Sequence, residues 1–230
     1  MKFIGWTLAT LVTITGAQAA ERVVVLELFT SQGCSSCPPA DVVLNTLADE
    51  DGIIALSRPV DYWDKLGWKD TLASPENTGK QRGYARTITS SNRVYTPQIV
   101  ADGVLEGIGS NESTVRRMIA TARARPQTAN IVANIADGGT WRIAVSGADG
   151  ADVHLIGYIP NARVVIEAGE NAGREIDYSN AVKSDEIIGT AGGAPLTTPV
   201  LAMESGLQYV VVVQEGAAGP IAGGVKLGGS

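Results

Sequence analysis

Two cysteines separated by two serines, Cys34 and Cys37, carry the most distinctive chemistry of this sequence. They are the only cysteines among 230 residues, so any thiol chemistry must take place here. Two thiols this close can cycle between a dithiol and a disulfide, or can form a small permanent disulfide. A loop this short restrains the unfolded chain little, which makes the pair a poor structural crosslink. The spacing therefore favours redox chemistry.

The residues on either side of the pair indicate how the chain positions it. Residues 23–29 are almost continuously apolar and β-branched, which is typical of a strand covered on both faces. Residues 30–33 form a turn, and residues 40–48 carry the pattern of an amphipathic helix. The unpaired N–H groups at a helix N-terminus favour a thiolate. We therefore expect Cys34 to be the exposed attacking thiol and Cys37 to be the less exposed resolving thiol.

Glu27 is an acid inside the apolar strand before the pair, where a charge is unfavourable unless it is paired or protonated. One interpretation places it at a strand end or edge, in solvent. The other places it under the thiol pair as a buried acid with a raised pKa, which relays the proton of Cys37. The sequence leaves both open.

A second segment, residues 94–100, is predicted to lie against the cysteines. Pro97 interrupts it and cannot donate to a sheet ladder, and a cis Thr96–Pro97 bond at a strand edge would explain its presence. The Asp-Gly sequence at residues 102–103 then predicts a hairpin turn into a partner strand over residues 104–108.

Four aromatic residues, Tyr62, Trp63, Trp68 and Tyr95, are candidates for a substrate groove beside the cysteines. The segment from residue 58 to residue 68 is aromatic, acidic and too irregular for a simple helix. The alternative is a loop that caps the core, with the two tryptophans as packing anchors.

The remaining elements of the first half alternate between strand and helix. Residues 52–57 predict a second strand, and Ser74-Pro75 predicts the start of a helix over residues 76–87. Asn111 or Ser110 is expected to cap a last helix that runs to about Arg125.

This order of elements resembles the thioredoxin fold. The resemblance implies an α/β domain over residues 21–125, with Cys34 as nucleophile, Cys37 as resolving thiol and Pro97 as a cis-proline opposite the pair, preceded by Thr96. It also implies that the backbone beside the proline binds a substrate segment as an added strand.

Four stretches resemble, more closely, an uncharacterised secreted bacterial family with a thioredoxin-like N-terminal half. They are residues 26–41, 60–70, 94–103 and the G-E-N-A-G-R sequence at 169–174. Arg58-Pro59 stands where an aromatic residue or a histidine is expected in such proteins, so the groove could differ here. This family resemblance implies no particular reaction.

The second half changes texture at about Pro126 and predicts an all-β, sandwich-like domain over residues 126–230, packed on the first domain. Short apolar runs are separated by turns rich in Gly, Asp and Asn. The predicted strands are residues 131–135, 141–145, 152–158, 163–166, 199–203, 209–213 and 221–227. His154 alternates with apolar neighbours and is expected at the surface. This half could limit access to Cys34 or dock a partner.

Residues 1–20 have the pattern of a secretory signal peptide. Lys2 precedes an apolar run over residues 3–14 that is too short to span a bilayer, and small residues end at Ala19 and Ala20. An uncleaved membrane anchor is the alternative. We expect an exported protein, periplasmic or secreted, with no stable membrane insertion after cleavage.

Composition argues against several other functions. The net charge is −6, and short basic clusters at residues 116–117 and 123–125 are interpreted as a solvated helix face, so no nucleic-acid partner is expected. Zinc needs about four N or S ligands, and the chain offers two cysteines and one histidine, so no metal site is expected. No cofactor is expected.

Three functions are compatible with the pair. The leading hypothesis is an exported thiol–disulfide oxidoreductase that acts on protein or small-molecule thiols and disulfides and is reset by a redox partner. The second is a non-catalytic accessory or binding protein with a static Cys34–Cys37 disulfide. The third is copper(I) handling by two soft thiolates, although no Met or His ligands lie close in sequence.

Overall fold

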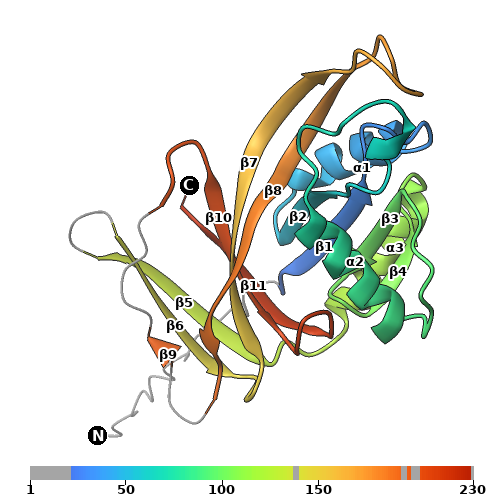
Figure 1. The fold of residues 1–230 in the computed structure, drawn as a ribbon. Coiled ribbons are helices and arrows are strands. Elements are labelled where there is room, and N and C mark those ends of the chain that lie inside the picture. The colour runs from blue at the N-terminus through green and yellow to red at the C-terminus, as the bar shows by residue number, and fades with distance from the viewer. Residues whose placement is uncertain (1–21, 137–139, 193–195, 198–202, 229–230) are drawn as a thin grey trace, which may run out of the picture.

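The computed structural model of the chain describes residues 22–136, 140–192, 196–197 and 203–228. The signal peptide predicted over residues 1–20, and most of the strand predicted over 199–203, lie outside these ranges. The described part is a mixed α/β structure with one eight-stranded sheet and one three-stranded sheet (Figure 1). Within it, no helix is long and apolar enough to cross a membrane.

The first half contributes four adjacent strands to the large sheet, in the order β2-β1-β3-β4. Strand β1 (Val24–Thr30) runs parallel to β2 (Ile53–Pro59), whereas β3 (Gln98–Ala101) is antiparallel to both β1 and β4 (Leu105–Ile108). Asp102 and Gly103, both with positive φ, form the hairpin turn between β3 and β4. That turn confirms the prediction from the Asp-Gly pair, although β3 begins at Gln98 and residues 94–97 are not strand.

Three helices cover the two faces of these strands. The helices are α1 (Pro38–Ala48), α2 (Pro75–Thr87) and α3 (Glu112–Arg123). The side chains of Ser74 and Asn111 cap α2 and α3, as predicted. The core against α1 and α3 is made of alternate strand residues, among them Leu26, Leu28, Ile99, Leu44, Leu47, Val115 and Ile119. Tyr84 of α2 packs on the opposite face, with Phe29 and Val100.

Four strands of the second half continue the same sheet, which corrects the expectation of a separate sandwich after residue 126. Strand β8 (Glu175–Thr190) joins β2 in parallel through the pair Ser57 and Ala181. Strands β7 (Asp152–Val165), β10 (Gln208–Gln214) and β11 (Ile221–Leu227) follow outward, each antiparallel to its neighbour. The continuity arises because β8 covers the edge of β2 that the first half leaves open.

The small sheet packs on one face of these second-half strands, so this part does contain two sheets with a common core. The small sheet has the order β5-β6-β9, formed by β5 (Ala129–Ala136), β6 (Thr140–Gly147) and β9 (Leu196–Thr197). Ile143 and Val145 of β6 share a buried cluster with Val153, Val211 and Val213 of the large sheet.

The β7–β8 hairpin is the feature that brings the second half to the cysteines. Strand β7 is continuous where the sequence predicted two short strands, and β8 was not predicted at all. Figure 1 shows the hairpin running past β2 to the end of α1 that carries the cysteines. Asn45 of α1 secures it, because its side chain donates to Asp177 O at 2.8 Å and accepts from Ser179 N at 2.9 Å.

Candidate functional site

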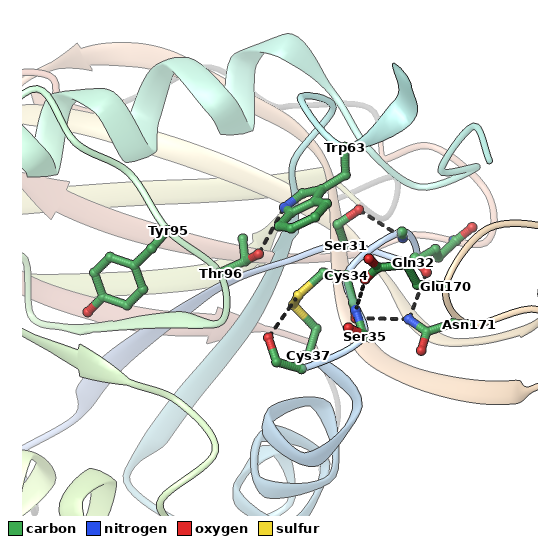
Figure 2. The surroundings of a disulfide bond; sticks show 12 residues. Ser31, Gln32, Cys34, Ser35, Cys37, Trp63, Tyr95, Thr96, Glu170 and Asn171 are labelled. Atoms are coloured by element: carbon green, nitrogen blue, oxygen red, sulfur yellow. Dashed lines mark hydrogen bonds between the residues drawn. A yellow bond between two sulfur atoms is a disulfide. The ribbon is translucent and has the colours of Figure 1, made fainter. Parts of the chain in front are cut away.

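Cys34 and Cys37 form a disulfide at the start of α1, just after the carboxyl end of β1. Their Cα atoms are 5.4 Å apart, and Cys37 is the N-cap residue of the helix. Backbone bonds close the turn, since Cys34 N donates to Ser31 O and Cys37 N donates to Cys34 O. The predicted strand, turn and helix therefore bring the pair to this position. Figure 2 shows its surroundings.

The disulfide is covered, which corrects the expectation of an exposed Cys34. Cys34 is 1% exposed and Cys37 is 0% exposed, whereas Ser35 and Ser36 between them are exposed. The sequence places Cys34 at a helix start, but it does not indicate what folds over that start. A reagent in solution therefore cannot reach Cys34 without movement of the groups that cover it.

The first turn of α1 has fewer free backbone N–H groups to stabilise a thiolate than we predicted from the sequence. Pro38 and Pro39, the first two helical residues, have no N–H group. The N–H groups of Ala40 and Asp41 both donate to Cys37 O. The hydroxyl of Ser36 contacts the pair, with its Oγ 3.4 Å from Cys34 Sγ.

The loop between β7 and β8, residues 166–174, closes one side of the site. The Asn171 side chain is fully buried and donates to Gln32 O at 2.9 Å and to Cys34 O at 2.8 Å. The Glu170 carboxylate accepts from Ser35 N at 3.2 Å. Figure 2 shows both side chains reaching the cysteine loop from the same side. This loop contains the G-E-N-A-G-R sequence, one of the four stretches that carry the family resemblance.

A polar network beneath the cysteine loop fixes its first residues. Gln32 N donates to Asp70 at 2.8 Å, and the Gln32 side-chain oxygen accepts from Trp68 Nε1 at 2.8 Å and from Thr71 N at 3.2 Å. Trp68 also packs with Leu72 and with the buried side chain of Ile166. Trp68 is thus a packing anchor between the cysteine loop and the β7–β8 loop, which was the alternative reading of this tryptophan.

The Thr96–Pro97 peptide bond is cis, which confirms that prediction. The Thr96 hydroxyl accepts from Trp63 Nε1 at 2.9 Å, and Figure 2 shows Trp63 and Thr96 on the side of the disulfide away from Glu170 and Asn171. Trp63 is half-buried, and Tyr62 packs beside it with ring centroids 6.3 Å apart.

Tyr95, the fourth groove candidate, is 37% exposed, and its hydroxyl donates to Glu106. Of the four aromatic residues, Trp63 therefore lies beside the disulfide with Tyr62 against it, whereas Trp68 belongs to the opposite side.

Comparison with known proteins assigns the chain to a family. Residues 25–214 match the family described as "Protein of unknown function (DUF1223)". The chain belongs to the DUF1223 family. This confirms the expected membership in a family of unknown function. No curated protein matches this DUF1223 chain.

Two solved structures are similar to this DUF1223 protein. A crystal structure of a protein from Agrobacterium tumefaciens is 31% identical, with a TM-score of 0.78, and the match covers 92% of this chain and 97% of that one. HBP35 of Porphyromonas gingivalis is 12% identical, with a TM-score of 0.57, and the match covers 90% of this chain and 75% of that one. The second likeness concerns the fold alone.

Glu27 of this DUF1223 protein is buried, as one interpretation expected, and does not lie in solvent at a strand end or edge. Its partners, however, are not the cysteines. It is buried on the face of β1 opposite α1, where it accepts from Arg58 Nε at 2.5 Å and from the Tyr84 hydroxyl. Arg58 also donates to Asp185 at 2.7 Å and to Asn77 at 3.2 Å. Although burial opposes it, the charges of Glu27 and Asp185 raise the pKa of the Arg58 guanidinium.

Arg58 therefore serves a buried ion-pair network and does not line the site. His154, expected at the surface, belongs to the same network and is 5% exposed. Its Nδ1 lies 2.7 Å from Asp185 Oδ1. Burial would raise the pKa of Asp185, but the charge of Arg58 and the hydrogen bond with His154 hold it below the usual range.

Asp41 is the buried acid next to the disulfide that the sequence did not single out. It lies four residues after Cys37, so both side chains share one face of α1. Its two carboxylate oxygens make no hydrogen bond of normal geometry within the described ranges, although the Thr30 hydroxyl is close enough to favour the ionised form. Burial outweighs this and raises the pKa of Asp41 well above its usual range, and the charge of Asp70 adds to the rise. The i, i+4 spacing from Cys37 was the available signal.

No cluster of three or more His, Cys, Asp or Glu side chains suited to a metal ion occurs in the described part of the chain. The copper(I) hypothesis would thus have to rely on the two sulfurs alone, after reduction of the disulfide.

Proposed function

We propose that this DUF1223 protein is an exported thiol–disulfide oxidoreductase that uses Cys34 and Cys37. The observation that carries the proposal is where the disulfide sits. It joins residues three apart within one turn, so it connects no two elements of the fold and adds little as a crosslink. A pair with little structural value at the junction of a central strand and a helix is better explained by chemistry.

The arrangement of the first half supports a thioredoxin-like reading of this site. Strand β1 leads into the cysteine helix α1, β2 returns parallel to β1, and β3 and β4 form the antiparallel hairpin before α3. This is the order that the sequence resemblance implies.

The proposed reaction is exchange with a substrate disulfide or dithiol. In the reductive direction, the Cys34 thiolate attacks one sulfur of a substrate disulfide, and the other substrate sulfur leaves as a thiolate that takes up a proton. Cys37, after losing its proton, attacks Cys34 Sγ and releases the second substrate thiol. Two electrons pass from the dithiol to the substrate, and a dithiol redox partner restores the reduced pair. The oxidative direction is the reverse.

The proposed function requires that a substrate reach the buried disulfide. Trp63 and the β7–β8 loop lie on either side of a disulfide that is nearly without exposed surface. A substrate must therefore displace one of them. The exposed residues Ser35 and Ser36, together with the half-buried Trp63, offer the nearest approach.

The test uses the mature chain in native buffer. The protein is equilibrated with glutathione mixtures, and the free thiols are counted by alkylation and mass spectrometry. A Cys37→Ala variant is incubated in parallel with a disulfide-containing peptide. Native reduction at a defined potential and a trapped mixed disulfide on Cys34 are the expected results. A pair that excess dithiol reduces only after unfolding in urea would refute the proposal.

The second candidate is a non-catalytic accessory or binding protein with a static disulfide. The burial of both cysteines favours it, because structural disulfides are commonly inaccessible to reductants. The same experiment separates the two functions: a fully native protein that keeps its disulfide in excess dithiol, and traps nothing as Cys37→Ala, is the result this candidate requires.

A further inference from the structure

Glu170 places a carboxylate against the backbone of the residue that follows the proposed nucleophile. Its Oε2 accepts from the backbone N–H of Ser35, the residue that follows Cys34, at 3.2 Å. Glu170 comes from the β7–β8 loop, 135 positions further along the chain. Within the described residues, no cation forms an ion pair with Glu170. A negative charge therefore stands near the sulfur with nothing in direct contact to neutralise it.

The loop holds this carboxylate in place. Asn171, next to Glu170, is fully buried and bonded to the carbonyl oxygens of Gln32 and Cys34. Gly173 N donates to Ile166 O at 2.7 Å, which closes the turn. Gly169 has φ of +78°, and a methyl group built on it would lie 3.2 Å from Trp68 Cβ. The position of Glu170 is thus set by the buried part of the loop.

The other ionisable groups around the cysteine loop do not replace Glu170. Asp41 on α1 and Asp70 in the segment before α2 are buried, and burial raises the pKa of both carboxyls. Arg174 is the cation of the same loop, and it lines a pocket with Pro38 and Asp41. The Ser35 N–H bonds to Glu170, so this donor is not directed at the sulfur. A Cys34 thiolate would therefore form next to a carboxylate, and a nearby like charge disfavours ionisation.

We propose that Glu170 is a positioning residue that opposes ionisation of Cys34 and makes the Cys34–Cys37 disulfide harder to reduce. The inference rests on the proposed oxidoreductase function and gives it a direction. When Cys34 ionises less readily, the reduced dithiol is less stable relative to the disulfide. The protein therefore transfers its two electrons to substrates more readily. The substrates in this direction are disulfides, and the protein acts as their reductant.

The test compares Glu170→Gln with wild type. The change removes the charge and keeps a side-chain oxygen that can accept from Ser35 N. The matched control is Glu167→Gln, an exposed acid of the same loop. The pKa of the Cys34 thiol is measured by thiolate absorbance and by the pH dependence of alkylation. The equilibrium constant with glutathione is measured on the same samples.

We expect Glu170→Gln to lower the pKa of the Cys34 thiol by about half a unit to one unit, because one like charge is removed. The equilibrium with glutathione should shift about three- to tenfold toward the dithiol, or about 15–30 mV. Both differences should shrink in about 1 M salt, which screens exposed charges. Glu167→Gln should match wild type in both measurements.

Three outcomes overturn the inference in distinguishable ways. If native wild type cannot be reduced, the proposed function fails and the inference fails with it. If native wild type is reduced, but Glu170→Gln has the same thiol pKa and the same equilibrium constant, the inference alone fails. A salt-independent shift would also contradict it, because the effect would then arise from loop structure rather than from charge.

Discussion

The Asn171 side chain donates to the carbonyl oxygen of Cys34 at 2.8 Å, although the two residues are 137 positions apart in the chain. The conformation of the cysteine loop therefore depends on a residue of the second half. The predicted domain boundary between residues 125 and 126 separates an alternating strand–helix pattern from a pattern of short strands. The candidate site, however, contains residues from both sides of this boundary. A fragment that ends at residue 125 would lack one wall of the site and the strands that cover β2.

Replacing Asn171 by Ala should make the disulfide react faster. The change removes both hydrogen bonds that tie the β7–β8 loop to Gln32 O and Cys34 O, and of these two carbonyl groups only Cys34 O keeps another donor, Cys37 N. We expect the rate of reduction by a small phosphine in native buffer to rise severalfold. We also expect the free energy of unfolding to fall by about 1–3 kcal/mol.

The matched control for this experiment is Asn134→Ala, on an exposed position of β5. It should leave both the reduction rate and the stability unchanged. An Asn171→Ala protein that is reduced as slowly as wild type would mean that this loop does not limit access to the sulfurs. Trp63 would then be the group to vary next.

Arg58→Met should strongly destabilise the protein. The change leaves the carboxylates of Glu27 and Asp185 buried without their shared cation, and removal of one partner from a buried ion pair typically costs about 3–5 kcal/mol. The exposed pair Arg163–Asp177 offers the comparison, because Arg163→Met should change the stability little. Urea unfolding of both variants measures this, and equal stabilities would show that the buried network is not held by charge.

The parts of the site that the sequence predicted correctly are those encoded by neighbouring residues. The helix after Cys37, the hairpin at Asp102-Gly103 and the cis bond before Pro97 each depend on a few adjacent residues. Turn chemistry and proline geometry act locally, so a single sequence is sufficient to find them.

The parts that the sequence missed depend on contacts between distant segments. Strand β8 is rich in Asp, Glu, Ser and Asn and gains its conformation from pairing along β7, so its own pattern was weak. The burial of Cys34 depends on a loop that follows it by more than a hundred residues. His154 alternates with apolar residues on β7, but it is buried and its ring contacts Asp185 of β8, a strand that the sequence did not predict.

Glu27→Gln should leave the thiol chemistry unchanged. Glu27 is bonded to Arg58 and Tyr84 on the face of β1 away from α1, so its carboxylate is engaged in the buried ion-pair network and not by the cysteines. We expect the alkylation rate of the reduced cysteines to follow the same pH profile as in wild type, while stability falls by on the order of 3 kcal/mol. A shifted profile would return Glu27 to the mechanism.

Asp41→Asn should make the protein more stable at neutral pH, and the gain should disappear in acid. Burial raises the pKa of Asp41 in the folded state, and the charge of Asp70 adds to the rise, so the folded protein holds a proton that the unfolded chain releases above its ordinary pKa of about 3.9. The stability that the protonated form confers is complete below that value and is lost as the pH rises toward the folded pKa. The asparagine variant has no proton to lose. Its advantage over wild type should therefore grow from about pH 4 upward, by at most about 1.4 kcal/mol per pH unit, and then level off.

Urea unfolding of the wild type and of Asp41→Asn between pH 4 and pH 8, with the disulfide intact, measures the difference. Asp177→Asn is the control with the opposite sign, because a hydrogen bond from Arg163 lowers the pKa of this exposed carboxyl and wild type then gains from ionisation. A constant difference between Asp41→Asn and wild type across this range would show that Asp41 is ionised in the folded protein.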